Sequence, residues 1–275
     1  MFLQLVIKVP QNLSERVENI LYESDVLGWE TQETGDFITY LVYSKDENSD
    51  VKELTATLSN LPEVEVSIQW IKEENWAEMW KENFKPIEVG DRLVIAPPWE
   101  SVKEKTKTVV IIEPGQAFGT GHHPTTKLML LHIEKIAEIL PKGAKVLDLG
   151  CGTGILSIAL LKLVPDAEVW AVDIDPEAIS ATLYNAKINQ VEKNIITSTN
   201  LPSKKFDLIM ANIGFRELKK LANYITGASK PNADAFLSGV LSEDKEELLE
   251  VYLNFGWKIK KAEDLQEWGF LWISR

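Results

Sequence analysis

Cysteine, histidine and long apolar runs are scarce in this chain, and each scarcity excludes a class of protein. A single cysteine, Cys151, cannot form an internal disulfide, so we expect a reducing, cytoplasmic location. The three histidines and the cysteine show no metal-ligand spacing, so we expect no metal site. No apolar run approaches the roughly 20 residues that cross a bilayer. The first residues also lack the basic start and cleavage site of a signal peptide, so we expect no membrane association.

Positive charge is in deficit as well. The chain has 29 Lys and Arg against 42 Asp and Glu, which gives a formal net charge of −13. Such a surface repels phosphate, so we expect no direct binding to nucleic acid. It would attract a basic partner, although the same charge also serves solubility alone. The length of 275 residues allows one large domain or two unequal ones.

The most informative stretch is residues 145–154, with the sequence Lys-Val-Leu-Asp-Leu-Gly-Cys-Gly-Thr-Gly. It predicts a short buried strand, then a glycine loop, then a helix over residues 155–164. Gly150 and Gly152 let the backbone approach a ligand closely. The spacing G-x-G-x-G differs from the G-x-G-x-x-G of dinucleotide sites. Because Asp148 also precedes the loop, we expect a ligand with a cationic end, such as S-adenosylmethionine with its sulfonium and ammonium groups.

A second strand, residues 168–173, follows at the expected distance and ends in a carboxylate. Asp173 lies 23 residues after Gly150, where an acid can accept hydrogen bonds from both ribose hydroxyls. Asp175 and Pro176 then predict an N-cap and a first helical position. Either strand alone fits any α/β protein, but together they predict an S-adenosylmethionine site.

Residues 1–70 predict a small separate domain. Strands and helices follow in the order β-α-β-β-α-β, which is the ferredoxin-like arrangement and hosts many functions. Residues 71–85 predict a linker helix with Trp76, Trp80 and Phe84 on one face. That aromatic face either packs against a domain or belongs to a hinge that carries the small domain.

Residues 86–275 predict a larger α/β domain in which strands and helices alternate from Ala144 onward. The last two strands are too close in sequence for a crossover helix, so we expect an antiparallel hairpin at the end of a mostly parallel sheet. This Rossmann-like layout is that of class I methyltransferases. The loop over residues 114–126 contains three glycines, Phe118 and Thr126. It is either a surface turn or, as we prefer, part of the site wall.

Four local motifs resemble those of one family, the bacterial ribosomal protein L-eleven (L11) methyltransferases, PrmA. They lie in residues 75–86, in residues 114–126, in residues 146–156 with 173–176, and in Ala211-Asn212-Ile213 with Ser238-Gly239. The sequence Phe-Gly-Thr-Gly-His-His-Pro-Thr-Thr at 118–126 is the most specific of them. Two departures from the family pattern are Glu113 in place of Asp, and Gly214-Phe215 in place of Leu-Ala. The second departure lies beside the expected methyl-acceptor site.

The resemblance implies an S-adenosylmethionine-dependent enzyme that methylates lysine ε-amines and the N-terminal α-amine of L11. The small domain would recognise L11, and the linker would let it swing. Cofactor contacts would fall on Thr126, Gly150, Asp173 and Asn212. We add Gly152 from the glycine loop and Phe118 as a cover for the cofactor, and we expect Asn212 to position the reacting amine.

Two alternatives stay open at this stage. One is a methyltransferase of the same fold with another amine or an amide acceptor, although Asn212-Ile-Gly-Phe215 differs from the Asn-Pro-Pro-Tyr of glutamine enzymes. The other is a non-catalytic cofactor-binding assembly factor. We expect a monomer, and the net charge favours free, basic L11 over the assembled ribosome as substrate.

Overall fold

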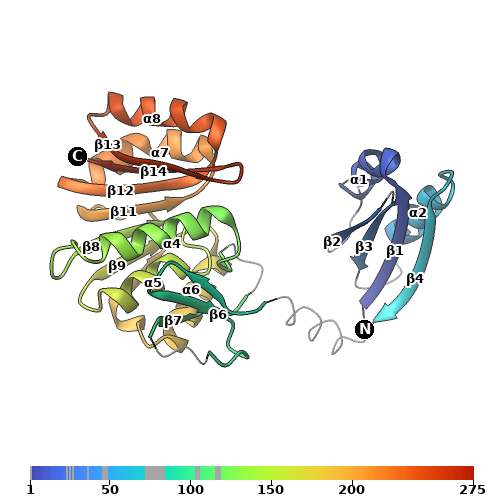
Figure 1. Cartoon of the computed structure of the whole chain (residues 1–275), viewed down its shortest axis with the longest axis horizontal. Helices are drawn as coiled ribbons and strands as arrows, with labels where there is room; N and C mark the ends of the chain where they lie inside the picture. The colour runs from blue at the N-terminus through green and yellow to red at the C-terminus, as the bar shows by residue number, and fades with distance from the viewer. Residues whose placement is uncertain are drawn as a thin grey trace. The chain divides into compact units, whose positions relative to one another are not determined.

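The computed structural model describes residues 2–22, 24, 26, 28–35, 37–44, 49–71, 84–102, 106–114 and 119–275. The chain divides into two compact units, Met1–Asn83 and Phe84–Arg275 (Figure 1). Most of the linker helix expected over residues 71–85 lies outside the described residues.

In its described residues, the N-terminal unit is a four-stranded antiparallel sheet with two α-helices. The strands pair in the order β2-β3-β1-β4, so the ferredoxin-like prediction is confirmed. The elements are β1 (Phe2–Pro10), η1 (Gln11–Leu13), α1 (Ser14–Tyr22), β2 (Gly28–Thr34), β3 (Phe37–Ser44), α2 (Ser49–Ser59) and β4 (Glu65–Ile71). Alternate residues of β1, from Leu3 to Val9, are buried with residues of both helices.

The other face of this sheet carries a row of polar side chains, one from each strand. Gln69 Nε2 donates to Gln4 Oε1 at 2.5 Å, and Gln4 Nε2 donates to Tyr43 Oη at 3.1 Å. Tyr43 Oη donates to Glu30 Oε1 at 3.4 Å. This polar row spans the whole sheet, so the face has hydrogen-bonding groups on every strand.

The C-terminal unit contains a seven-stranded sheet in the order β10-β9-β8-β11-β12-β14-β13. Its strands are β8 (Lys145–Leu149), β9 (Glu168–Val172), β10 (Ile195–Ser198), β11 (Phe206–Asn212), β12 (Ser229–Leu241), β13 (Lys258–Leu265) and β14 (Trp268–Ser274). Only β14 is antiparallel to β12, and β13 and β14 form a hairpin, as expected. The class I methyltransferase layout predicted from the sequence is therefore confirmed.

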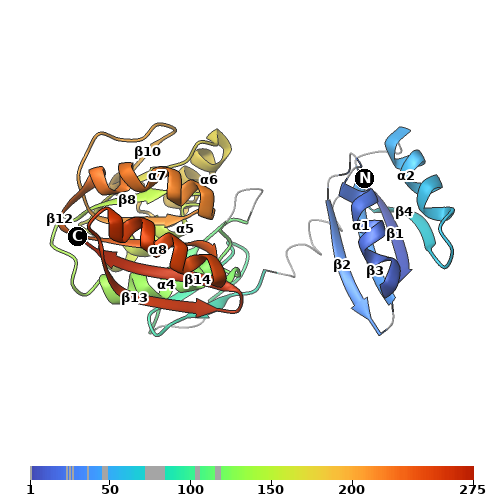
Figure 2. The ribbon, with the colours of Figure 1, turned by 90° about the horizontal axis from the view of Figure 1, so that it is seen from above.

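Helices cover both faces of this sheet, as Figures 1 and 2 show. The helices are α4 (Pro124–Ile136), α5 (Ile155–Leu163), α6 (Pro176–Ile188), α7 (Phe215–Ala228) and α8 (Lys245–Asn254), with short turns η2 (Glu192–Asn194) and η3 (Ser242–Asp244). Residues of α4, α5 and α6 belong to one core cluster, and residues of α7 and α8 to the other. Val146 and Leu147, neighbours on β8, lie in different clusters. Because this strand is buried on both faces, it reads as a continuous apolar run.

A smaller three-stranded sheet precedes α4. Strands β5 (Ile87–Val89) and β6 (Leu93–Ala96) are antiparallel, and β7 (Thr108–Ile111) is parallel to β6. Asn189, at the end of α6, holds this sheet, because its Oδ1 accepts from Ile111 N at 2.9 Å. The strands therefore place the following loop against the larger sheet.

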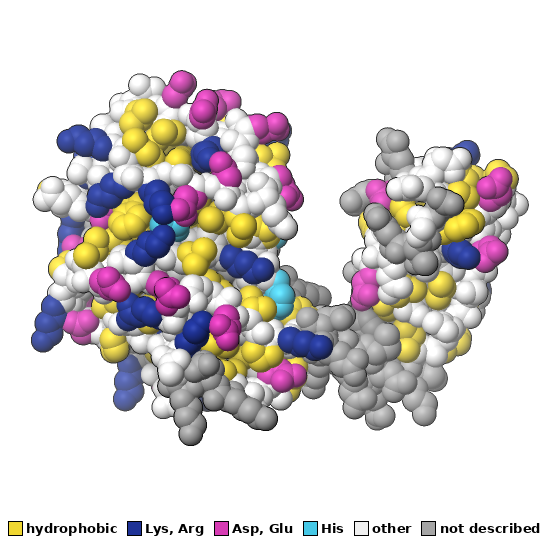
Figure 3. All heavy atoms as spheres, viewed as in Figure 1, with side chains coloured by type: hydrophobic (Ala, Val, Ile, Leu, Met, Phe, Trp, Pro, Cys, Tyr) yellow, Lys and Arg dark blue, Asp and Glu magenta, His cyan; other side chains and the backbone are white. Residues whose placement is uncertain are grey.

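Acidic and basic side chains are interspersed on the face of the C-terminal unit in Figure 3. Within the described residues, no helix is long and apolar enough to cross a membrane. The same residues contain no group of three or more His, Cys, Asp or Glu side chains that could hold a metal ion.

Candidate functional site

The glycine loop between β8 and α5 is shaped by residues that must be glycine. Gly150, Gly152 and Gly154 have φ of 76°, 55° and 79°, in the left-handed region. A Cβ on Gly150 would lie 2.3 Å from Ile213 Cγ2. A Cβ on Gly154 would lie 2.9 Å from Thr182 Cγ2. The loop therefore fits closely between Ile213, directly after β11, and α6, and Gly150 and Gly152 line a cavity beside it.

Asp173, directly after β9, is bonded to this loop. Its Oδ2 accepts from Gly152 N at 3.0 Å, and its Oδ1 accepts from Asp175 N at 3.1 Å. A carboxylate has about four lone-pair sites, so each oxygen can still accept from a ligand hydroxyl. Asp175 caps α6 by accepting from Glu177 N at 2.8 Å, with Pro176 in the first turn, which confirms the predicted helix start.

Asn212 ends β11, the strand next to β8. Its Oδ1 is buried and has no hydrogen-bond partner within the described part of the chain. The turn after it is held by Ile213 N, which donates to Ser238 O at 3.2 Å. Gly239, with φ of 88°, allows this approach, because a Cβ there would lie 2.4 Å from Ile213 O. The Ser238-Gly239 motif thus fixes the backbone beside Asn212.

These residues line one cavity of about 470 Å³ at the carboxyl ends of the strands. Its walls are Leu149, Gly150, Gly152, Val172, Asp173, Ile174, Asp175, Ala178, Thr199, Leu201, Asn212, Ile213, Glu217 and Leu221. The carboxyl edge of such a sheet is where ligands bind in open α/β folds. The lining includes three carboxylates and, among the residues described, no Lys, Arg or His. The cavity therefore favours a cationic ligand over a diphosphate.

Four of the six predicted site residues, Gly150, Gly152, Asp173 and Asn212, come together in this cavity. Thr126 does not line it. That residue lies in the first turn of α4 and is buried, and its Oγ1 has no partner among the described residues. Phe118 lies outside the described residues.

The loop before Thr126 packs on the glycine loop, because Thr153 Oγ1 donates to Gly119 O at 2.5 Å. His123 has a structural role as the N-cap of α4, where its Nδ1 accepts from Thr125 N at 3.3 Å. His122 stacks edge-on against Phe84 at 5.5 Å. The loop thus joins α4 to the cavity wall.

Sequence reasoning missed the apolar and acidic walls of the cavity. Ile174 is 92% exposed although it is isoleucine, and its place directly after Asp173 is a signal that could have indicated ligand contact. Leu201, Leu221 and Glu217 carry no such local signal. Leu201 reaches the cavity because the β10–β11 connection passes beside it, and Glu217 and Leu221 reach it because α7 packs against the sheet with these residues toward the cavity.

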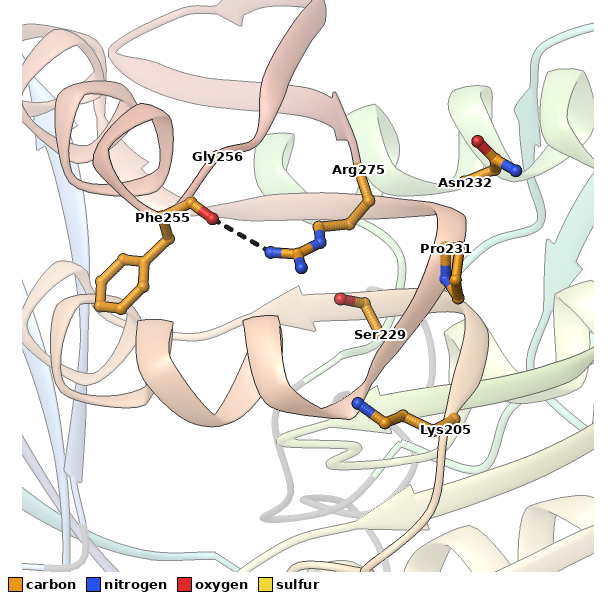
Figure 4. A pocket seen from close by; sticks show the side chains of 7 residues that line it. All are labelled: Lys205, Ser229, Pro231, Asn232, Phe255, Gly256 and Arg275. Carbon is orange, nitrogen blue, oxygen red and sulfur yellow. Dashed lines mark hydrogen bonds between the residues drawn. The ribbon is translucent and has the colours of Figure 1, made fainter.

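A second cavity opens at the opposite, amino-terminal edge of the sheet (Figure 4). Lys205 and Arg275 point into it, and both cations bond to backbone carbonyls. Arg275 Nη1 donates to Phe255 O at 3.0 Å, and Lys205 Nζ donates to Gly227 O. Its other residues lie at or before the starts of β11, β12 and β13, and Arg275 follows the antiparallel β14, so this edge is not the carboxyl edge and we assign the reaction site to the first cavity.

Comparison with known proteins decides the family. The model of the family described as "Ribosomal protein L11 methyltransferase (PrmA)" matches residues 1–275. The chain belongs to this family. It is 38% identical over 211 residues to the ribosomal protein L11 methyltransferase of Tolumonas auensis, covering 75% of this chain and 70% of that protein. It is 35% identical over 226 residues to that of Neisseria meningitidis, covering 82% and 75%.

A solved structure agrees. The crystal structure of ribosomal protein L11 methylase from Lactobacillus delbrueckii subsp. bulgaricus matches with a TM-score of 0.64 and 30% identity. The match covers 70% of this chain and 99% of that one. This PrmA-family chain is therefore an S-adenosylmethionine-dependent methyltransferase, and the predicted cofactor is confirmed.

The residues of the cavity fit S-adenosylmethionine in this family member. Asp173 offers lone pairs to a ribose, Gly150 and Gly152 bring their backbone to the cavity wall, and Asn212 presents an oxygen with no partner among the described residues. The carboxylates favour a sulfonium and an ammonium over uncharged groups.

Two residues in or beside the glycine loop have structural roles instead. Asp148 is fully buried, and its Oδ2 accepts from Ser157 N at 3.2 Å and Ser157 Oγ at 2.6 Å. Burial raises the pKa of this carboxyl to about 6, although the Ser157 bonds oppose the shift. Asp148 thus holds the start of α5 and does not line the cavity. Burial also raises the pKa of the Cys151 thiol, which supports a packing role over a nucleophilic one.

Proposed function

We propose that this methyltransferase transfers methyl groups to lysine ε-amines and the N-terminal α-amine of L11. The observation that supports this most directly is the buried, unpartnered Asn212 oxygen in a cavity lined by carboxylates. An amine N–H is a donor that this oxygen can accept from, and a cationic amine suits the electrostatics of the cavity.

The chemical difficulty is the proton on the acceptor amine. When bound, S-adenosylmethionine supplies an electrophilic methyl group, and only a neutral amine has a free lone pair to attack it. With a pKa of ~10.4, about one lysine in a few thousand is neutral at pH 7, a cost of roughly 4–5 kcal/mol. The apolar walls Leu201, Ile213 and Leu221 lower this cost, because desolvation lowers the pKa of an amine. Bulk water can then take the proton before attack.

Asn212 is the catalytic residue in this proposal. Its Oδ1 would accept one amine N–H and direct the lone pair toward the methyl group. The Ile213–Ser238 backbone bond holds the turn in place, so the oxygen is positioned before substrate arrives. Most of the acceleration would come from this positioning.

We also propose roles for the two units, with residues 1–70 recognising L11, residues 71–85 linking, and residues 86–275 carrying the reaction. The exposed ends of the polar row across the small sheet, Glu30 and Gln69, offer hydrogen-bonding groups to a protein partner. The net charge of −13 favours free, basic L11, with the enzyme acting as a monomer. The single cysteine suits a reducing cytoplasm.

The test is transfer of tritiated methyl from S-adenosylmethionine to purified L11, with the modified amines mapped by mass spectrometry. We expect label on lysine ε-amines and the α-amine. Asn212→Ala should lower the single-turnover rate at saturating cofactor more than tenfold. Asn223→Ala, an exposed asparagine on α7, is the matched control. Label on an amide, or cofactor binding without transfer to any protein, would contradict the proposal.

A further inference from the structure

Gly214, the N-cap of α7, opens a space beside the acceptor side of the cavity. Its backbone is extended, with φ of −61° and ψ of 154°, so its conformation alone does not require glycine. The absence of a side chain at Gly214 instead leaves room for the carboxylate of Glu217. Glu217 Oε2 lies 2.7 Å from the position that a Cβ on Gly214 would occupy. Any larger residue at 214 would displace this carboxylate.

Glu217 lines the same cavity as Asn212 and comes from the first turn of α7. A glutamate at this helix position often accepts from the N-cap N–H. In the described structure, however, no hydrogen bond to the Glu217 carboxylate is formed. Its Oε1 lies 3.9 Å from Lys220 Nζ in an exposed pair, which contributes little. The carboxylate is therefore available to a ligand.

The other two carboxylates of the cavity are already engaged. Asp173 accepts from Gly152 N and Asp175 N, and Asp175 accepts from Glu177 N. Both lie on the β9 side, where they hold the glycine loop and cap α6. Glu217 lies across the cavity on the α7 side, next to the turn that follows Asn212.

We propose that Glu217 binds the acceptor amine in its ammonium form and so selects cationic acceptors. This inference rests on the proposed function. The carboxylate attracts the charged amine as it enters beside Asn212, and Asn212 orients the neutral form that reacts. The two steps oppose each other, because a nearby carboxylate raises the pKa of an amine and disfavours its deprotonation. Capture is thus improved at the expense of the chemical step.

The test is Glu217→Gln, which keeps the shape and removes the charge. We expect the KM for L11 to rise about fivefold, the gain of a partly exposed ion pair. The kcat at pH 7 should not fall, and the rising limb of its pH profile should move to lower pH, because the bound amine loses a charge that raised its pKa. Cofactor affinity by calorimetry should stay within about twofold.

Two further variants make the result specific. Gly214→Ala should raise the KM in the same direction, since its Cβ displaces the carboxylate. Glu247→Gln removes a nearby α8 carboxylate that pairs with Lys219 and does not line the cavity, so its KM should match the native enzyme.

Weaker cofactor binding in Glu217→Gln with an unchanged KM for L11 would overturn the inference in favour of a cofactor contact. Unchanged kinetics throughout would also overturn it and leave the proposed function standing. A native enzyme that transfers no methyl to L11 would instead overturn the proposed function, and this inference with it.

Discussion

At the scale of single residues, the polar groups of the site serve the fold and the ligand together. Asp173 is the clearest case, because its oxygens hold Gly152 and Asp175 while keeping lone pairs for a ribose. Asp148 differs, since both of its Ser157 bonds are internal and it does not line the cavity. We therefore expect a substitution of Asp173 to change cofactor affinity and a substitution of Asp148 to change the pH dependence of stability.

For Asp173, we predict that Asp173→Ala weakens cofactor binding by about 1.5–3 kcal/mol, or roughly 10- to 150-fold in Kd, the range for hydrogen bonds to a charged group. Calorimetry with S-adenosylmethionine measures this. The matched control is Asp166→Ala, because Asp166 also accepts from a glycine, Gly143 N at 3.2 Å, but it precedes β9 whereas Asp173 follows that strand, and it does not line the cavity. Equal affinities in the native protein and Asp173→Ala would remove the ribose contact.

For Asp148, the prediction concerns pH. Its folded pKa of about 6 lies above its unfolded value of ~3.9, so the folded state binds the extra proton between these values. The carboxyl therefore favours folding most below pH ~4, and this contribution is lost as the pH rises through 6. Asp148→Asn does not titrate, so its stability relative to the native protein should rise by about 2 kcal/mol from pH 4 to 7. Urea denaturation across this range tests it, and parallel stability curves would contradict it.

At the scale of elements, buried strands could be predicted and the ends of elements could not. Strands β8 and β11 read clearly because both faces are buried, which leaves continuous apolar runs. The apolar pattern of β12 starts only at Ala233, but the strand begins at Ser229. Its first residues include the polar Lys230 and Asn232, which break the apolar pattern that would indicate a strand. The ladder with β11 is also irregular there.

Helix α4 shows the same limit. The apolar pattern that follows Pro124 runs to Leu140, but α4 ends at Ile136 and continues only as turns. Pro141 disfavours helical backbone in the residue before it. For the site, motifs indicated the residues at strand ends, whereas Glu217 and Leu221 depend on how α7 is rotated against the sheet.

The ladder between β12 and β14 shifts register between Ser238 and Val240, and this bulge at Gly239 gives the prediction at this scale. Gly239→Ala would place a Cβ 2.4 Å from Ile213 O at a φ of 88°, where the clashing atoms are backbone. We expect a loss of about 2 kcal/mol in the free energy of unfolding, from the left-handed conformation alone, and a lower methyl-transfer rate as Asn212 moves. The control is Gly227→Ala, in α7 with no atom within 4 Å of the new Cβ, which should stabilise by roughly 0.5–1 kcal/mol. Urea denaturation measures both, and equal effects would show that the bulge does not depend on glycine.

At the scale of the whole molecule, the chain joins two units with separate cores. The described core of residues 3–58 is one cluster, and both clusters of the large sheet lie entirely within residues 84–275. Every residue of the cofactor cavity belongs to the C-terminal unit. The order of elements in each unit could be read from the sequence, because hydrophobic periodicity is local.

This separation predicts what each unit does alone. A fragment of residues 84–275 should fold and bind S-adenosylmethionine within about threefold of the full chain, because its cores and cavity are complete. Its kcat/KM on L11 should fall about a hundredfold, since contacts remote from the reacting amine would be lost with the small unit. A short lysine peptide that cannot reach the small unit serves as the control substrate, and its rate should be equal for fragment and full chain. A fragment that methylates L11 as well as the full chain would assign recognition to the large unit, and one that fails to bind the cofactor would show that the two units do not fold independently.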